Sequence, residues 1–209
     1  MKLIDQSWEW MQKPPANTLH IIEKAGRNCY KSEDKITDDS AEKFVKMILK
    51  SWHHSVIEHI SASVKLVTNR GVLQEIARHR LISLSVESTR YVNYGGKDME
   101  FIRPVWWDDW DEIQQIDFYE ACFDSKCAYD ALLERGAKPE QAREVLPNAL
   151  KTEIVMTANL REWMHVFKLR CQKAAHPQIR ELLRSVLIGF YKEISIVFDD
   201  LYEKYAATS

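Results

Sequence analysis

The pattern of apolar and polar residues predicts helices over much of the chain. In residues 37–52 the apolar positions fall three and four apart, which is typical of an amphipathic helix, and Thr37 or Asp38 can cap its first turn. A second helix is expected over residues 110–135. Gly136 should close it, because glycine often ends a helix in the left-handed conformation.

The second half of the chain carries three further helical patterns. Pro139 marks the first turn of a short helix that runs to Pro147, and Asn159 can cap a helix that runs to about residue 172. From Pro177 to Tyr202 the apolar residues step by threes and fours without a break, which predicts one long helix. Its apolar stripe is wide for a small domain. We therefore expect it either to fill the core or to pack partly against another subunit.

Shorter stretches predict strands. Residues 61–68 alternate between apolar and polar side chains, which is typical of a half-buried antiparallel strand. Residues 19–23 are interpreted as a first strand, residues 150–157 as a strand or a helix, and residues 90–101 as a strand or hairpin. Residues 69–80 predict a helix, and we expect the serine-rich run after it to be a loop.

Composition narrows the class of protein. The chain has 209 residues, of which 45% are hydrophobic, enough for the core of a single domain spanning the whole chain. The 29 basic and 31 acidic residues give a formal net charge of -2, so the overall charge does not suggest a nucleic-acid or membrane partner. The sequence shows no membrane-spanning apolar run, no signal peptide and no CxxC pair. We therefore expect a cytoplasmic protein with reduced thiols.

A group of anion-binding side chains ends the predicted helix of residues 69–80. Arg78, His79 and Arg80 are consecutive, and four hydroxyl side chains follow before Arg90. Arginine presents a planar fork of N–H donors that suits phosphate or carboxylate. The group therefore indicates a site for a phosphorylated ligand, although a solvated helix end followed by a polar loop would show the same pattern.

Residues 53–59 carry three histidines and one glutamate, which suggests a metal site. The order of His53, His54, Glu58 and His59 does not match a helical zinc motif. A loop that contacts a ligand through His53 and Ser55 fits the sequence better, and so does a purely structural role.

Candidates for a nucleophile or a mobile lid are weak. Cys171 follows Arg170, which would favour a thiolate, but a lone cysteine on a helix is more often structural. The tryptophans at 106, 107 and 110 suggest either a lid or a packed anchor, and we favour the anchor.

Many arginines and few acid–base groups predict a protein that binds a phosphorylated planar ligand and lets a cofactor perform the difficult step. A non-catalytic nucleotide- or RNA-binding module is the alternative.

The motif Arg78-His79-Arg80, followed by seven residues and Ser88, resembles the signature of the flavin-dependent thymidylate synthases, or thymidylate synthase complementing proteins. Four further blocks resemble this family and follow its order. They are Ile57-Glu58-His59, STRY at 88–91, REVLP at 143–147 and the segment from Asn159 to Arg170. The resemblance implies an α/β (α+β) fold with a mainly antiparallel sheet flanked by helices, a long helical core, and a homotetramer whose sites are shared between subunits.

The resemblance also implies a reaction. Enzymes of this family convert dUMP to dTMP with 5,10-methylenetetrahydrofolate as carbon donor and NADPH as reductant. Hydride passes through FAD, and no enzyme nucleophile and no metal are needed.

Roles for individual residues follow from the same resemblance. The positions that match flavin contacts are Ser55, Arg78, His79, Arg80, Asn159, Arg161 and His165. The positions that match the dUMP site are Glu75, Arg78, Val86, Glu87, Ser88, Thr89, Arg90, Arg143 and Arg170. Arg170 matches the position proposed to polarise the pyrimidine, which is physically sensible because a fixed cation stabilises charge developing on the ring. Val86 departs from the family, since some members carry Glu or Gln there.

Overall fold

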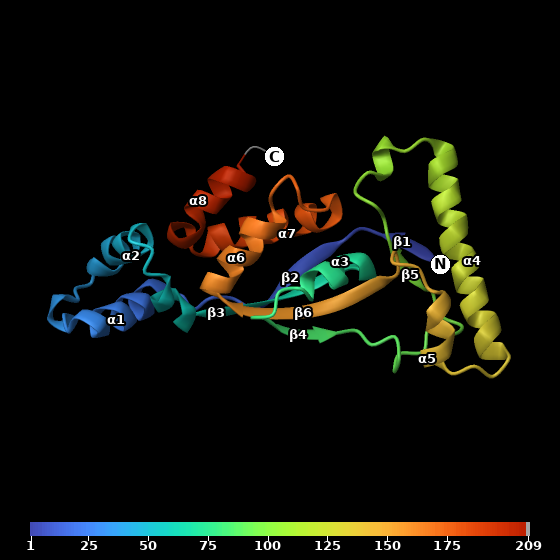
Figure 1. Ribbon diagram of the computed structural model, residues 1–209, viewed down its shortest axis with the longest axis horizontal. Helices are drawn as coiled ribbons and strands as arrows, with labels where there is room; N and C mark the ends of the chain where they lie inside the picture. The colour runs from blue at the N-terminus through green and yellow to red at the C-terminus, as the bar shows by residue number, and fades with distance from the viewer. Residues whose placement is uncertain (208–209) are drawn as a thin grey trace. The chain divides into compact units, whose positions relative to one another are not determined.

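The computed structural model (Figure 1) describes residues 1–207. These residues form two compact units. The first unit consists of residues 1–8, 65–78 and 84–155. The second unit consists of residues 9–64, 79–83 and 156 onwards. The expectation that the whole chain forms one domain stays a prediction.

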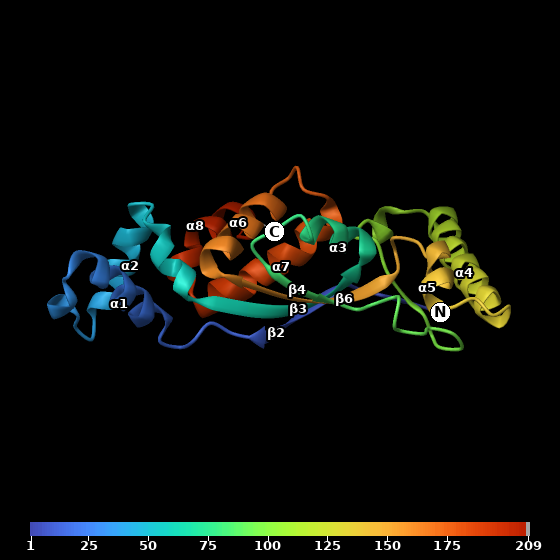
Figure 2. The ribbon, with the colours of Figure 1, turned by 60° about the horizontal axis from the view of Figure 1, so that its bottom comes forward.

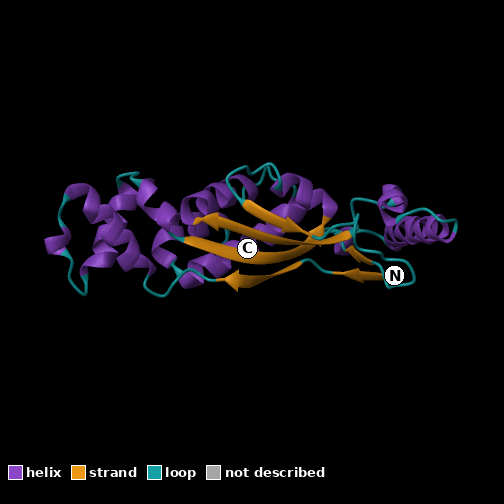
Figure 3. Cartoon of the chain, turned by 90° about the horizontal axis from the view of Figure 1, so that it is seen from below, coloured by secondary structure: helices purple, strands orange, loops and turns teal. Residues whose placement is uncertain are grey.

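The strands form two sheets. They are β1 (Lys2–Ile4), β2 (Ser7–Gln12), β3 (Ser61–Asn69), β4 (Ser83–Val86), β5 (Glu100–Ile102) and β6 (Lys151–Asn159). β1 pairs with β5 in parallel, and the other four form a sheet in the order β2-β3-β6-β4, with their strands side by side in Figure 3. The expected fold class, α/β with a mainly antiparallel sheet and flanking helices, is confirmed.

Eight α-helices occur in the described residues. They are α1 (Thr18–Tyr30), α2 (Ser40–Lys50), α3 (Arg70–Ile76), α4 (Glu112–Glu134), α5 (Pro139–Ala142), α6 (Leu160–Arg170), α7 (Pro177–Glu193) and α8 (Ser195–Tyr205). Short 3-10 helices cover Glu33–Lys35, His54–His59, Trp107–Asp109 and Arg143–Val145. Three predicted helices are confirmed as α2, α4 and α6, and Gly136 closes α4 with a φ of 89°. Within residues 1–207, no helix has both the length and the apolar character needed to cross a bilayer.

Two predicted segments adopt different secondary structure. Residues 19–23 belong to helix α1 and not to a strand, because the buried residues Ile22, Glu23 and Gly26 follow helical spacing. The serine-rich run is not all loop, since Ser83–Val86 forms β4. β4 is the outer strand in the order of its sheet, and its side chains are largely exposed, so no hydrophobic alternation reveals it.

Three other boundaries differ from the predictions. Residues 90–101 are turns and irregular chain, with strand only at β5, and α3 ends at Ile76 rather than near Arg80. The helix predicted from Pro139 to Pro147 becomes a short α-helix followed by a 3-10 turn. Residues 150–157, for which the sequence allowed a strand or a helix, lie almost entirely in strand β6, whose residues alternate in burial.

The long C-terminal stripe is divided between two helices. Ile194 has a φ of -145°, which breaks the helix, and α7 and α8 pack against each other and against α6 (Figure 2). The apolar side chains of α7 are buried inside the chain, so core packing accounts for them and a subunit contact is not needed there.

Each unit has its own apolar core. In the first unit, Phe101 of β5 and Tyr129 of α4 are fully buried in a cluster that also includes Leu150, the residue before β6. In the second unit, the rings of Trp163, Phe167 and Phe190 pack at centroid distances of 4.7 to 5.5 Å. Trp163 is the anchor of this core, since its indole N–H is also satisfied by donating to the carbonyl of Ala62 at 3.1 Å.

Candidate active site

Two asparagines set the start of the helices that follow β3 and β6. Asn69 Oδ1 accepts the backbone N–H of Val72 at 2.8 Å, and Asn159 Oδ1 accepts that of Glu162 at 2.9 Å. A side-chain cap of this kind fixes where the first helical turn begins. The cap at Asn159 therefore sets the register of α6, which carries four of the residues discussed below.

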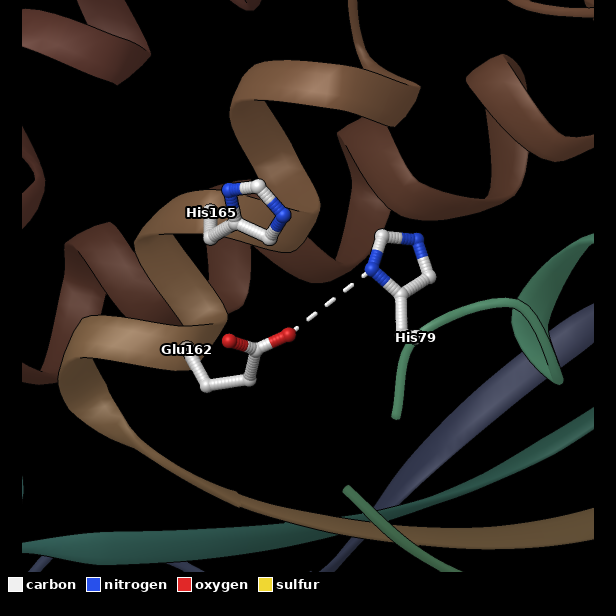
Figure 4. A group of neighbouring side chains, drawn as sticks. All are labelled: His79, Glu162 and His165. Atoms are coloured by element: carbon white, nitrogen blue, oxygen red, sulfur yellow. Dashed lines mark ion pairs between the residues drawn. The ribbon is translucent and has the colours of Figure 1, made fainter. Parts of the chain in front are cut away.

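One residue of the Arg78–Arg80 motif is buried, and α6 surrounds it with polar groups. His79 is only 6% exposed. Arg170 Nε donates a hydrogen bond to His79 Nε2 at 3.0 Å, and Glu162 Oε1 lies 3.8 Å from His79 Nδ1. The ring of His165 meets that of His79 edge-on, with centroids 5.9 Å apart (Figure 4). Three residues matched to the family's sites, His79, His165 and Arg170, thus lie together with Glu162.

The contacts of His79 determine its protonation state. Burial, followed by the charges of Arg170 and His165, lowers the pKa of His79 from 6.5 to about 4. The imidazole is therefore neutral at pH 7. A guanidinium can only donate, so Nε2 must be the acceptor and the single ring proton sits on Nδ1, facing Glu162. His79 thereby holds the Arg170 side chain through a neutral acceptor, which adds no negative charge of its own.

The same cluster has the donor types of a metal site, because the ligand atoms of His79, Glu162 and His165 lie within 4.8 Å of one another. A metal on His79 Nδ1 would require the ring proton on Nε2, where it would oppose the N–H of Arg170. The hydrogen bond thus favours a polar cluster that positions Arg170. Within residues 1–207, His53, His54 and His59 form no group with comparable spacing.

A pocket of about 430 Å³ in the second unit includes two of the residues matched to flavin contacts. Ser55 and Arg161 line it. Arg161 is exposed and pairs with Glu58, whose carboxylate accepts from its Nη1 at 2.5 Å. The other lining residues are Gly26, Cys29, Tyr30, Ile48, Trp52, His53, His54 and Val56.

The remaining residues matched to flavin contacts differ in exposure. Arg78 and Arg80 are exposed, His165 is exposed one turn after Arg161, and Asn159 uses its side-chain oxygen in the helix cap. Arg78 belongs to the first unit and Arg80 to the second. The two arginines therefore present their guanidinium groups to solvent, while the histidine between them is buried.

Most residues matched to the dUMP site lie in the first unit and form local contacts there. Ser88 Oγ accepts the backbone N–H groups of Arg90 at 3.3 Å and Tyr91 at 3.4 Å, which makes a tight turn. Arg143 donates to the buried Thr89 hydroxyl at 3.4 Å. Arg90 pairs with Glu140 at 3.1 Å, and both side chains are exposed. These arginines are thus held near a hydroxyl-rich turn and keep access to solvent.

Glu87 is already engaged within the protein. Its carboxylate accepts the Tyr94 hydroxyl at 2.7 Å and the backbone N–H of Glu153 at 3.2 Å, and it pairs with Lys151 at 3.4 Å. Glu87 thus anchors the end of β4 to β6. Val86 beside it is exposed, and Glu75 is half-buried on α3.

Cys171 and the tryptophans at 107 and 110 have structural roles. Burial raises the pKa of the Cys171 thiol to about 12, so it is protonated at neutral pH and unsuited to nucleophilic attack. Trp107 and Trp110 pack on Phe118 at 5.9 and 5.7 Å, as expected for an anchor.

Sequence reasoning missed Glu162, Tyr30 and Trp52. Glu162 precedes His165 by three residues, a spacing that places both on one helix face and could have revealed it. Tyr30 and Trp52 lie more than twenty residues apart, and no local pattern brings them to the same pocket.

Comparisons with known proteins identify the family of the chain. The sequence profile of the family described as thymidylate synthase complementing protein matches residues 12–194. The chain belongs to this family. A flavin-dependent thymidylate synthase of Geobacter sulfurreducens is 34% identical over 172 residues, covering 78% of this chain and 73% of the relative. A probable flavin-dependent thymidylate synthase of Mycobacterium phage D29 is 36% identical over 197 residues, covering 83% and 82%.

A solved structure shares the fold of this flavin-dependent thymidylate synthase family member. It is the UMP/dUMP methylase PolB from Streptomyces cacaoi bound with 5-Br dUMP, with a TM-score of 0.82, 23% identity and 98% coverage of both chains. Membership in the family confirms the expected enzyme class, the flavin-dependent thymidylate synthases, which are methyltransferases.

Proposed function

We propose that the protein is an FAD-dependent thymidylate synthase that methylates dUMP to dTMP. 5,10-Methylenetetrahydrofolate would donate the carbon and NADPH the reducing equivalents. The methylene carbon would bond to the pyrimidine ring as its bonds to the two folate nitrogens break, and tetrahydrofolate would leave. A ring proton would be lost, and one hydride that originates from NADPH would reduce the methylene to a methyl group, leaving NADP+. The relatives named flavin-dependent thymidylate synthases and the dUMP-analogue complex of the structural neighbour support this proposal.

The observation that carries the proposal is the hydrogen bond from Arg170 to His79. A neutral histidine restricts the movement of this arginine and adds no negative charge beside it. Such a preorganised cation would stabilise negative charge that develops on a bound pyrimidine. No enzyme nucleophile is required, in agreement with the raised pKa of Cys171.

The residues of the second unit suit a flavin. The pocket of about 430 Å³ lies in the size range of small-molecule sites. It combines flat side chains, which suit a ring, with the Arg161 guanidinium and the Ser55 hydroxyl, which suit phosphate. The residues of this unit that would hold FAD are Ser55, His79, Arg80, Asn159, Arg161 and His165, and FAD when bound would supply the hydride.

The first unit offers groups for the nucleotide. The guanidinium groups of Arg90 and Arg143, next to the Ser88 and Thr89 hydroxyls, would bind the phosphate of dUMP. Glu87 would act indirectly, because its carboxylate is satisfied by protein donors.

We further propose a cytoplasmic homotetramer with sites shared between subunits. Exposed apolar side chains on α4 support assembly. They are Ile113, Ile116, Tyr119 and Phe123. Light scattering should give about four times the chain mass of 24.5 kDa, and a monomer at micromolar concentration would contradict the assembly.

The test of the enzymatic proposal begins with an absorbance spectrum of the purified protein. The protein should be yellow, or become yellow with FAD, and NADPH should bleach it without oxygen. With dUMP and methylenetetrahydrofolate it should then form dTMP, detected by mass spectrometry.

The variant Arg170→Ala should lose dTMP formation and retain flavin, whereas Arg90→Ala should mainly raise KM for dUMP. Protein that cannot be loaded with FAD, or full turnover by Arg170→Ala, would refute the proposal. Strong salt-dependent binding of RNA without turnover would favour the binding-module alternative.

A further inference from the structure

Trp52 occupies a backbone position that normally suits glycine. It follows helix α2 with a φ of 59°, its N–H donates to the Leu49 carbonyl at 3.1 Å, and the N–H of His53 donates to the Ile48 carbonyl at 3.1 Å. This pair of bonds is the Schellman ending of a helix, in which the left-handed residue is usually glycine. A bulky side chain at such a φ is uncommon and strained.

The same chain shows the usual solution at the end of α4. Gly136 has a φ of 89°, with N–H bonds from Gly136 to Leu133 and from Ala137 to Leu132, both at 2.9 Å. The same helix ending is thus formed with glycine elsewhere in this protein. The tryptophan at 52 is not required by the backbone.

The indole of Trp52 is also poorly placed for stabilising the fold. Trp52 is 79% exposed, and its ring stacks on the imidazole of His54, with centroids 5.4 Å apart and an angle of 26°. Most of its apolar surface therefore faces solvent, an arrangement that contributes little to burial.

Lys31 is a second residue other than glycine with a positive φ. It ends α1 in the left-handed conformation with a φ of 48°, and its ammonium donates to Asn28 at 3.2 Å. Left-handed backbone alone thus occurs elsewhere in this chain. Trp52 differs because it exposes a large flat ring, and because that ring lines a pocket.

The pocket beside Trp52 is suited to a flat ligand. It measures about 430 Å³ and is also lined by Tyr30 and His53, whose side chains hydrogen-bond to each other at 3.1 Å. Arg161 lines the same pocket; its exposed guanidinium pairs with Glu58 through Nη1 and carries further N–H donors. Indole, phenol and imidazole rings around one space favour stacking on a heterocycle, and an arginine favours an attached phosphate.

We propose that Trp52 determines cofactor affinity and specificity by stacking on a planar heterocyclic ring of a phosphorylated dinucleotide in this pocket. The inference rests on the proposed function and adds to it a residue that the family resemblance does not assign. The ring belongs either to FAD or to NADPH, because both carry flat heterocycles next to phosphate.

The experiment compares Trp52→Gly, Trp52→Phe and Lys31→Gly in the full-length protein. Glycine at either position relieves the left-handed strain, so both glycine variants should unfold at the wild-type temperature or above it. Trp52→Gly should weaken FAD binding, measured by quenching of flavin fluorescence, or raise KM for NADPH, by about tenfold. Trp52→Phe should retain most of the affinity, and Lys31→Gly should leave both values unchanged.

The two cofactors form separate arms of the test. A change confined to the FAD dissociation constant assigns the ring to FAD, and a change confined to KM for NADPH assigns it to NADPH. If Trp52→Gly matches the wild type in both, or if it unfolds at a clearly lower temperature, the inference is wrong, while dTMP formation by the wild type still supports the proposed function. If the wild type binds neither cofactor and forms no dTMP, both proposals fail together.

Discussion

The side chains of Arg170 and His79 are joined by a hydrogen bond of 3.0 Å from Nε to Nε2, between residues 91 positions apart in the sequence. Because guanidinium groups only donate, the bond fixes the neutral tautomer of a buried histidine. The charge of Arg170 is in turn one cause of the low pKa of His79. The two residues thus stabilise each other in the states that the proposed chemistry needs.

The low pKa of His79 predicts a loss of stability in acid. The folded protein binds a proton at this site only near pH 4, whereas the unfolded chain binds it near 6.5. The free energy of unfolding should therefore fall as pH drops from about 6.5 to about 4, by up to about 1.4 kcal/mol per pH unit from this residue.

The measurement is urea denaturation at several pH values for the wild type and His79→Gln. Glutamine can still accept from Arg170 through its carbonyl oxygen but does not titrate. The variant should show a flatter dependence over this range. Equal slopes for the two proteins would show that His79 does not titrate abnormally.

Gly26 allows a close approach between α1 and α2. A Cβ at this position would lie 2.5 and 2.7 Å from the Cε1 and Cζ atoms of the Phe44 ring. Gly26→Ala should therefore lower the free energy of unfolding by about 1–3 kcal/mol, because the ring is buried and cannot move freely. The matched control introduces Gly26→Ala into a Phe44→Leu background. There the alanine should lower the free energy of unfolding by less than it does in the wild type, because the smaller leucine leaves room for the Cβ. A stabilised Gly26→Ala variant would contradict this packing.

Asn69 and Asn159 cap helices in the same way, but only Asn159 matches a flavin contact. Replacing either by alanine should reduce stability by about 1 kcal/mol, because one helical N–H loses its acceptor. Only Asn159→Ala should also weaken FAD binding, measured by flavin fluorescence. Equal flavin affinity of the two variants would remove Asn159 from the cofactor site.

Glu87 and Tyr94 form a partly buried pair whose oxygens lie 2.7 Å apart. Burial, and then the hydrogen bond to Glu87 and its charge, raise the pKa of the Tyr94 phenol, so it donates throughout the physiological range. A double-mutant cycle with Glu87→Gln and Tyr94→Phe should give a coupling of about 1–3 kcal/mol in chemical denaturation. A coupling near zero would mean that the bond contributes nothing to stability.

The same cycle tests the place of Glu87 in the dUMP site. If Glu87 acts only by anchoring β4, both single variants should change KM for dUMP to a similar extent. A larger change in KM for dUMP with Glu87→Gln than with Tyr94→Phe would indicate a direct contact between Glu87 and the substrate.

Local patterns predicted the elements whose signals lie within a few residues. The apolar spacing of α2, the alternation of β3 and the cap at Asn159 were all sufficient, since each depends on neighbours along the chain. The edge strand β4 was missed because its largely exposed side chains carry no alternation. The break at Ile194 was missed because the apolar stripe continues across it.

The sequence by itself determined the family, the enzyme class and the arginine-rich motif, because these depend on residue types in a fixed order. Tertiary structure alone decided that His79 is buried with its ring proton toward Glu162 while Arg78 and Arg80 face solvent. It also decided that Trp52 lines a pocket with Tyr30 and Arg161. Burial and through-space charge set these properties, and both arise only when segments far apart in the chain come into contact.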